Sequence, residues 1–415
     1  MKFYKFYKFL ISLIIILTLS IHPVLADDEE DELSPNFSSI TVSSNNTSIP
    51  TINSRSAIIY DRSSGSILYG KAENEKRKMA STTKIMTAII VIENSNLDDI
   101  VTISQKAAGT GGSRLGLHVN DKISIRDLLY GLLLCSGNDS AVALAETIGG
   151  SVEEFANLMN QKAISLGLNS THFVTPHGLD NDDHYTTAYE LALITDYALK
   201  NDIFCNLVGS KTHTILINNQ PKTLSNTNEL LGNLNGVYGV KTGFTNGANR
   251  CLVTSVKRDN MDLICIVLGA DTKKDRTKDS VALIEYAFKN FKLVNIQEKI
   301  IAEFSNWKLC NSSSINVKKG ISKKIDVVLE NLPYNFLPVN SNHPNDVSIY
   351  IYCNPNLEAP LPTKSSIGYL TVNIDGKTVL TLNIYNSNEI SKKVPINFYK
   401  DLLSEYPSYL ESLFY

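Results

Sequence analysis

Three short groups of residues in this sequence have the types and spacing that a serine acyl-transfer site needs. The first is Ser81-Thr82-Thr83-Lys84, which stands at the head of the apolar run Ile85–Ile92. If this segment is helical, Lys84 lies one turn after Ser81 on the same face. A serine hydroxyl needs a base to take its proton, and a neutral lysine can be that base. Burial and a helix N-terminus both favour the neutral form.

The second group is Ser136-Gly137-Asn138, which follows the apolar stretch Leu128–Leu134 and so falls in a loop between two expected helices. Ser136 could relay a proton, and Asn138 could bind a substrate amide or orient Lys84. An ordinary turn leading to a helix N-cap has the same composition. This group therefore predicts a site only together with the others.

The third group is Lys241-Thr242-Gly243, at the end of a strand expected over Val237–Lys241. The edge of a strand can pair with the backbone of an extended peptide. Lys241 and Thr242 suit a terminal carboxylate, and Gly243 would let a substrate approach the backbone closely. Each group is weak alone, but the three in this order strongly predict a serine acyl-transfer site.

The elements that must position these groups predict an α+β fold for residues 54–293. A hairpin is expected from two short strands around residues 61–65, and helices follow to about residue 200, with capping boxes at 151–154 and 187–190. Strands then return at 237–241, 251–256 and 263–268, before a helix at 280–291. We expect one antiparallel sheet built from both ends of this segment, with helices packed on it.

Residues 294–395 have a different pattern and predict a second, all-β domain, a small sandwich. Its expected strands are 324–329, 347–352, 369–374 and 379–385, and Asp375-Gly376 between the last two is a hairpin signal.

The two ends of the chain predict export and a terminal amphipathic segment. Residues 1–26 have the lysines, apolar run and Val24-Leu25-Ala26 site of a cleaved signal peptide, and residues 27–53 read as an acidic, polar spacer. Residues 396–415 carry an apolar stripe that could lie in a membrane interface or pack on the second domain. Their acidic charge and Pro407 argue against the membrane. We expect the protein to work at the cell wall or the outer face of the cytoplasmic membrane.

Composition excludes two other classes of function. The formal net charge of -3 gives no electrostatic basis for binding nucleic acid. The histidines and cysteines lack the spacing of a metal site, so neither a metal nor another cofactor is expected. The cysteines read as buried free thiols, with Cys251–Cys265 the one pair that merits a test as a disulfide.

With these motifs in hand, the sequence resembles the low-molecular-mass penicillin-binding proteins, the serine D-alanyl-D-alanine carboxypeptidases. The resemblance covers about residues 56–291, and more loosely the segment to residue 385. It rests on the segments 79–87 (MASTTKIMT), 128–139 (LLYGLLLCSGND), 175–180 (TPHGLD) and 239–245 (GVKTGFT), and in the second domain on 357–360 (LEAP) and 367–368 (IG).

The resemblance implies a β-lactamase/transpeptidase-like catalytic domain and a role for each matching residue. Ser81 would attack the bond between the last two D-alanines of a peptidoglycan pentapeptide, with Lys84 as base. The family further implies proton transfer to the leaving amine through Ser136 and Lys241. It implies an oxyanion hole of the Ser81 and Phe244 backbone N–H groups, and recognition of the terminal carboxylate by Thr242 and Arg276. It also implies slow release of β-lactams.

Two alternatives stay open on the sequence alone. A class A β-lactamase has related motifs, but it needs a deacylating glutamate before the third motif, and residues 176–183 contain none. A non-catalytic penicillin sensor or wall-binding module is the other alternative. It should have lost Ser81 or Lys84, and a sensor needs membrane-spanning helices that the sequence after residue 26 does not offer.

Overall fold

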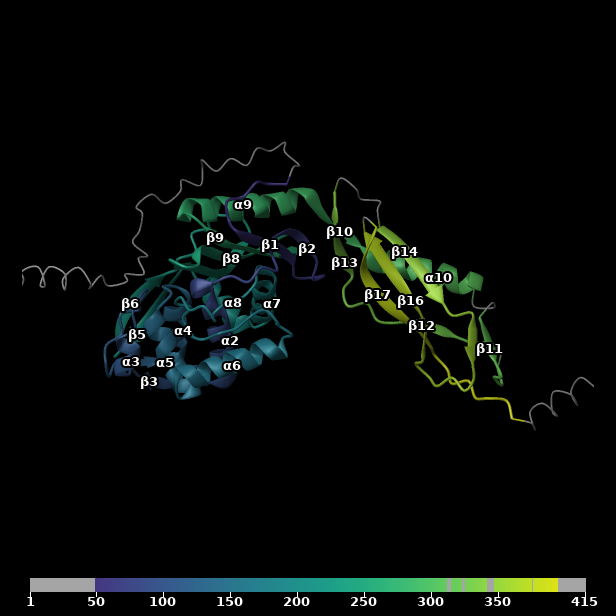
Figure 1. Cartoon of the computed structure of the whole chain (residues 1–415), viewed down its shortest axis with the longest axis horizontal. Coiled ribbons are helices and arrows are strands. Elements are labelled where there is room, and N and C mark those ends of the chain that lie inside the picture. Colours follow the sequence, from purple (N-terminus) through teal and green to yellow (C-terminus); the bar gives the residue numbers. More distant parts are fainter. Residues whose placement is uncertain (1–48, 312–314, 323–324, 342–346, 375, 395–415) are drawn as a thin grey trace, which may run out of the picture. The chain divides into compact units, whose positions relative to one another are not determined.

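The computed structural model describes residues 49–311, 315–322, 325–341, 347–374 and 376–394 (Figure 1). The chain forms two compact units, the first ending at Lys289 and the second beginning at Asn290. The predicted signal peptide, nearly all of the predicted spacer and the terminal segment 396–415 lie outside the described residues.

The first unit is built on a five-stranded antiparallel sheet of order β2-β1-β9-β8-β7. The central strands consist largely of aliphatic residues and are buried, and every residue of β1 is buried. Strands from both ends of the unit therefore share one sheet, as the sequence predicted. Figure 1 shows α9 along one face of this sheet and the other helices against the opposite face. The strands are β1 (Ser56–Asp61), β2 (Ile67–Lys71), β7 (Val237–Thr245), β8 (Asn249–Arg258) and β9 (Met261–Ala270).

Helix α2 is the core of the helical layer. It is buried continuously from Lys84 to Val91, because other helices pack around it and leave it little solvent-exposed surface. Both predicted helix starts are N-capped, since Ser151 accepts from the Glu154 N–H and Thr187 accepts from the Glu190 N–H. The reciprocal half of each predicted capping box is not seen, because the Glu154 carboxylate accepts from Asn157 and the Glu190 carboxylate accepts from residues 169–171. The helical segments are η2 (Ala80–Thr83), α2 (Lys84–Asn94), α3 (Gln105–Ala108), α4 (Ile125–Leu133), α5 (Asn138–Gly149), α6 (Val152–Ser165), α7 (Ala188–Ala198), α8 (Asp202–Gly209) and α9 (Lys273–Asn290).

Two small antiparallel ribbons flank the helices of this unit. They are formed by β3 (Ile100–Thr102) with β4 (Lys122–Ser124), and by β5 (Thr212–Ile217) with β6 (Gln220–Ser225).

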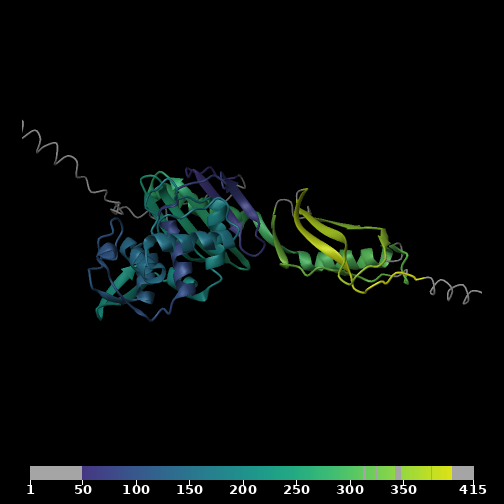
Figure 2. The same ribbon diagram turned by 60° about the horizontal axis from the view of Figure 1, so that its bottom comes forward.

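The second unit is not all β, which corrects the prediction from sequence. Helix α10 (Ile296–Asn311) precedes most of its strands, and Ile296, Ile300 and Phe304 repeat at helical spacing to cover the apolar face of a four-stranded sheet. Figure 2 shows this helix lying along the sheet. The sheet has the order β12-β17-β16-β14, with β12 (Val327–Leu329), β14 (Val347–Cys353), β16 (Ser366–Ile374) and β17 (Lys377–Asn386).

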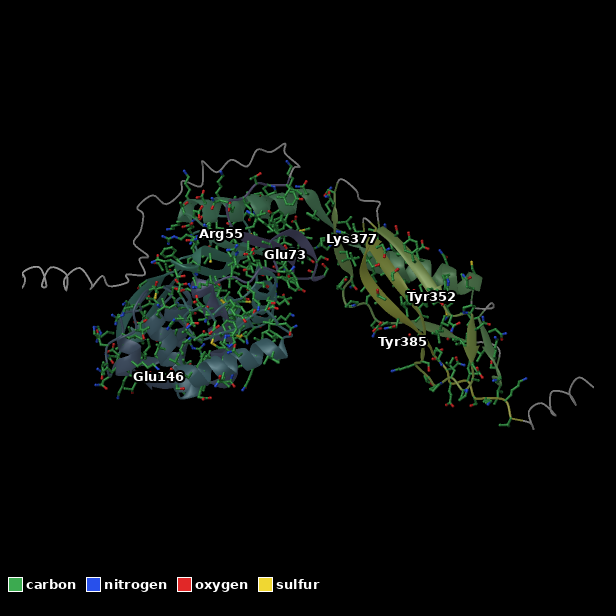
Figure 3. All side chains as sticks on the ribbon, in the orientation of Figure 1. Arg55, Glu73, Glu146, Tyr352, Lys377 and Tyr385 are labelled. Atoms are coloured by element: carbon green, nitrogen blue, oxygen red, sulfur yellow. The ribbon has the colours of Figure 1, made fainter. Side chains whose placement is uncertain are left out.

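Two shorter ladders complete the second unit. They pair β10 (Phe291–Asn295) with β13 (Phe336–Asn340), and β11 (Asn316–Lys318) with β15 (Asn356–Glu358). Tyr352 of β14, labelled in Figure 3, lies on this sheet. Its ring centroid is 5.2 Å from that of Tyr369 of β16.

All six cysteines are described and free. Cys265 is opposite Thr254 in the β8–β9 ladder, so Cys251 is three positions out of register with it. Burial raises the pKa of the Cys251 thiol to about 11. The pair that merited a test is therefore not a disulfide, and the expectation of buried thiols holds best for Cys251 and Cys265, while Cys310 is exposed.

Candidate active site

Ser81 and Lys84 lie at the junction of two helical segments. Ser81 is in the 3-10 turn η2, and α2 begins only at Lys84, which refines the prediction that Ser81 opens the α-helix. Side chains three residues apart eclipse one another in a 3-10 turn. The Lys84 Nζ accordingly lies 2.8 Å from the Ser81 Oγ. Ser81 is partly exposed, whereas Lys84 is completely buried, so the hydroxyl can meet a ligand and the amine cannot meet bulk water.

Three further oxygen atoms surround the Lys84 Nζ. The Asn138 Oδ1 is 2.6 Å away, the Ser136 Oγ 3.3 Å and the His177 carbonyl oxygen 3.2 Å. Residues more than fifty positions apart in sequence thus meet at one nitrogen atom. The structure brings the first two sequence motifs together as expected, with Asn138 oriented toward Lys84.

The loop before α5 fixes Ser136 and Asn138. Ser136 adopts a positive φ of 62°, which is uncommon for a residue with a side chain and turns the chain sharply after α4. The Asn138 Nδ2 donates to the Gly111 carbonyl at 2.8 Å, so the amide oxygen is the atom that faces Lys84. The next residue, Asp139, is buried and accepts three N–H bonds from residues 115–117. The sequence analysis did not identify this anchoring role of Asp139.

The third motif lies on β7, the last strand in the sheet order. This strand runs to Thr245, so the motif is inside it rather than at its end. Lys241 is 1% exposed and donates to the Thr242 carbonyl at 3.1 Å. Burial and the charge of Asp139 raise the pKa of the Cys135 thiol, and the positive charge of Lys241 acts against them.

At Gly243 and Phe244, the backbone of β7 packs against the turn η2, which carries Ser81. A Cβ at position 243 would lie 3.2 Å from both the Ser81 nitrogen and the Met79 carbonyl oxygen. A side chain there would crowd η2, which explains the glycine. The two N–H groups predicted for an oxyanion hole, those of Ser81 and Phe244, therefore belong to adjacent backbone segments. The Phe244 ring lies 3.8 Å from the Arg250 guanidinium.

Arg276, on the first turns of α9, contacts none of the other predicted site residues in the described structure. It is 3% exposed, and its Nη2 donates to the Glu229 Oε1 at 2.9 Å. Thr242 contacts the residue Thr227, two positions before Glu229, through their hydroxyls at 2.8 Å. Arg276 is thus connected to the third motif through this neighbouring segment.

The loop of residues 175–184, for which the sequence predicted no catalytic role, also helps to build the site. Besides the His177 carbonyl at Lys84, the Pro176 carbonyl accepts from the Thr87 hydroxyl at 2.6 Å. Gly178 has a φ of +85°, and a Cβ there would lie 2.0 Å from the Ala80 carbonyl oxygen. Asp180 accepts from the Thr245 hydroxyl at 2.6 Å. The loop therefore joins η2, α2 and the end of β7.

Two histidines in this loop, the buried His184 and the half-buried His177, are neutral at physiological pH. Burial lowers the pKa of His177 to about 3, and the nearby Lys84 acts in the same direction whenever its amine is protonated. Burial also lowers the pKa of His184 to about 4. The His184 Nε2 lies 2.7 Å from the Thr83 hydroxyl, and its Nδ1 accepts from the Val174 N–H. A neutral ring with Nδ1 as the acceptor fits both contacts.

Among the described residues, no cluster of histidine, cysteine, aspartate and glutamate side chains could hold a metal ion. Over the same part of the chain, no helix combines the length and the apolar character needed to cross a membrane.

Comparison with known proteins agrees with this geometry. The model of the D-alanyl-D-alanine carboxypeptidase family matches residues 43–272, and that of the penicillin-binding protein 5 C-terminal domain matches residues 306–392. The chain is 32% identical to the D-alanyl-D-alanine carboxypeptidase DacF of Bacillus subtilis over 86% of this chain and 90% of DacF. For DacC of Escherichia coli the identity is 33%, over 80% of this chain and 82% of DacC.

Among solved structures, penicillin binding protein 5 from Haemophilus influenzae is similar with a TM-score of 0.69 and 28% identity. The likeness covers 83% of this chain and 99% of that one. The fold is therefore that of the penicillin-binding protein 5 type. This chain belongs to the D-alanyl-D-alanine carboxypeptidase family of serine peptidases.

Proposed function

We propose that Ser81 is the nucleophile that removes the terminal D-alanine from peptidoglycan stem peptides. The observation that carries this proposal is the position of the Lys84 Nζ, 2.8 Å from the Ser81 Oγ and shielded from solvent. Ser81 attacks the carbonyl carbon between the last two D-alanines, its proton moves to Lys84, and an acyl-enzyme forms as the terminal D-alanine leaves.

Lys84 acts as base in its neutral form. A neutral amine has two N–H donors and one lone pair, and the lone pair must point at the Ser81 hydroxyl. The Asn138 Oδ1 and the His177 carbonyl are suitable acceptors for the two donors. Complete burial favours the neutral amine because a buried charge loses its hydration.

The proton then reaches the leaving amine through Ser136, with Lys241 in support. The Ser136 Oγ is 3.3 Å from the Lys84 Nζ, and Lys241 is the buried basic residue of the third motif on β7. The N–H groups of Ser81 and Phe244 stabilise the negative charge on the carbonyl oxygen in the transition state. The same groups serve when water attacks the acyl-enzyme.

The substrate lies extended along the edge of β7. Backbone pairing there is open to a peptide because β7 is the last strand of the sheet, and the small Gly243 allows a close approach. We place its terminal carboxylate at Thr242 and Arg276, which provide a hydroxyl and a guanidinium.

β-Lactams acylate Ser81 in the same way and are released slowly. The β-lactamase alternative would need a carboxylate that activates water for fast release. Class A β-lactamases carry that carboxylate in a loop before the third motif. In this chain the corresponding loop contains Asp180, whose carboxylate accepts from the Thr245 hydroxyl and the Gly247 N–H instead. Asp182 of the same loop pairs with Lys78 at 3.0 Å.

We also propose that the enzyme acts outside the cytoplasm and that residues 396–415 bind a membrane surface weakly. Aromatic and leucine residues repeat at helical spacing in this segment, and such stripes bind lipid interfaces. A mature enzyme lacking residues 396–415 should remain in solution with vesicles while it still hydrolyses peptide. Failure of the full mature chain to sediment with vesicles would refute membrane binding.

The central test compares two activities of the purified mature enzyme. We expect D-alanine release from a pentapeptide ending in D-alanyl-D-alanine, no release from the same peptide ending in L-alanine, and turnover of a labelled penicillin slower by orders of magnitude. Fast penicillin turnover without D-alanine release would support the β-lactamase alternative. Penicillin labelling with neither D-alanine release nor penicillin turnover would support the non-catalytic sensor or wall-binding alternative.

A further inference from the structure

Glu229 is a largely buried carboxylate to which the mechanism above gives no role. Its Oε1 accepts from the Arg276 Nη2 at 2.9 Å and from the Thr277 hydroxyl, and its Oε2 lies 3.3 Å from the Lys273 Nζ. Burial alone raises the pKa of Glu229, but the charge of Arg276, the Thr277 hydroxyl and the charge of Lys273 together bring it below its ordinary value. Glu229 is therefore an anion at neutral pH.

The segment that carries Glu229 lies directly beside the third motif. The Thr227 hydroxyl is 2.8 Å from the Thr242 hydroxyl, and the Asn228 Nδ2 donates to the Gly239 carbonyl at 2.9 Å. The Asn228 side chain also accepts from the Leu230 N–H, which holds the backbone on both sides of Glu229. The hydrogen bonds of its neighbours Thr227 and Asn228 therefore hold the backbone of Glu229 next to β7.

Arg276 lies at the same end of the sheet. Helix α9 begins three residues after β9 ends at Ala270, and Ala270 is opposite Arg250, which in turn is opposite Phe244 of β7. The positive charge of Arg276 also acts on Cys251, the residue opposite Gly243. The Arg276 Nε is buried and has no hydrogen-bond partner in the described structure. The guanidinium therefore has donor capacity that Glu229 does not use.

We propose that Glu229 competes with the terminal carboxylate of the substrate for Arg276, and so sets how strongly the enzyme prefers peptides with a free carboxylate. The inference rests on the proposed role of Arg276 and Thr242 in carboxylate binding. Substrate must share or take over the guanidinium that Glu229 holds in the free enzyme. Glu229 also keeps the buried Arg276 charge paired whenever no substrate is bound.

Charge arithmetic gives the sign of the effect. Arg276 and Lys273 contribute two positive charges, and Glu229 contributes one negative charge. A neutral residue at position 229 raises the local charge from +1 to +2 and frees the Arg276 Nη2. Competition therefore predicts tighter binding of an anionic substrate without Glu229, whereas a purely supporting role predicts weaker binding.

The test is the Glu229→Gln variant, assayed on one peptide in two forms, with a free terminal carboxylate and with a carboxamide. We expect the KM for the free-carboxylate peptide to fall roughly three- to tenfold, with little change for the carboxamide. Glu285→Gln is the matched control. Glu285 lies on α9, as Arg276 does, and its carboxylate pairs with Arg258 of β8 at 2.6 Å. This variant should leave both KM values unchanged.

A second variant shows that the effect passes through Arg276. Glu229→Gln in an Arg276→Ala background should not lower the KM further. If Glu229→Gln does not fold, Glu229→Asp withdraws the carboxylate from Arg276 and should lower the KM in the same sense by a smaller factor.

A KM that rises, stays constant or falls equally for both peptide forms overturns the competing role of Glu229. Wild-type enzyme that releases no D-alanine from either form would instead refute the proposed function itself.

Discussion

The two ends of the site hold their cations in different ways. Lys84 is completely buried, and its Nζ lies within hydrogen-bond distance of four oxygens. They come from η2, the loop before α5, the first residue of α5 and the loop at His177. Arg276 is nearly as buried, yet its guanidinium bonds to one carboxylate, Glu229, and leaves the Nε without a partner in the described structure.

This difference separates catalysis from recognition. Groups that move a proton must hold their geometry before the substrate arrives, because reorganisation during the reaction would raise the barrier. A group that binds the substrate's charge must instead exchange one partner for another. The neighbourhood of Lys84 suits the first task, and the Glu229–Arg276 pair suits the second.

The largest expected effect comes from changing the charge at the Lys84 end. Lys84→Arg keeps a long cation but cannot become neutral at working pH, so Ser81 loses its base. D-Alanine release and penicillin acylation should both fall by a factor on the order of a thousand or more. The control is the folded state, followed by circular dichroism and thermal unfolding. Acylation near the wild-type rate would rule out a neutral lysine as base.

Loss of one acceptor around Lys84 should have a smaller effect. Asn138→Ala removes the 2.6 Å contact and the link to the Gly111 carbonyl, which leaves the amine less well oriented. We expect kcat to fall roughly ten- to a hundredfold with little change in KM. Stopped-flow acylation by a chromogenic β-lactam measures this directly. A change confined to KM would move Asn138 from catalysis to substrate binding.

Changes at the Arg276 end should affect KM in place of kcat. Arg276→Ala and Thr242→Ala should raise the KM for a free-carboxylate peptide roughly tenfold to a hundredfold, as expected for losing a hydrogen bond to a charged group. The carboxamide form of the peptide is the control and should change far less. Equal effects on both forms would remove these residues from carboxylate recognition.

The smallest expected effect concerns the loop at His177, and it appears in stability. The pKa of His184 is about 4 in the folded protein, below the 6.5 of a free histidine, so the unfolded chain binds a proton that the folded chain excludes. Stability is therefore complete above pH 6.5 and falls as the pH drops toward 4, by about 1.4 kcal/mol per pH unit for one such histidine.

A substitution tests this contribution of His184. His184→Gln should flatten the dependence of the unfolding free energy on pH between 6.5 and 4, measured by urea denaturation at several pH values. A slope identical to wild type would show that His184 does not carry the effect. His177, with its pKa of about 3, should account for a slope that remains in the variant.

Sequence reasoning succeeded where residue type and spacing determine the result. The buried helix after Lys84, the shared sheet and the approach of Asn138 to Lys84 followed from apolar periodicity and from motif order. The N-caps at Ser151 and Thr187 followed from local hydrogen-bonding chemistry.

The contributions that sequence reasoning missed depend on contacts between distant segments. The His177 carbonyl is a backbone group, which every residue has, so no residue type marks its contact with Lys84. Glu229 looks like any surface acid until folding brings it to Arg276. Helix α10 was missed because charged residues separate its apolar positions Ile296, Ile300 and Phe304, and the later strands dominated the prediction for that region.

The role of Ser81 is tested most directly by locating the acyl group on the protein. The mature enzyme is incubated with a β-lactam, digested, and mapped by mass spectrometry. One adduct is expected, on Ser81. The Ser81→Ala variant should carry no adduct and should release D-alanine at least roughly a thousandfold more slowly than wild type. An adduct on another residue, or labelling that persists in Ser81→Ala, would contradict the assignment of Ser81 as the nucleophile.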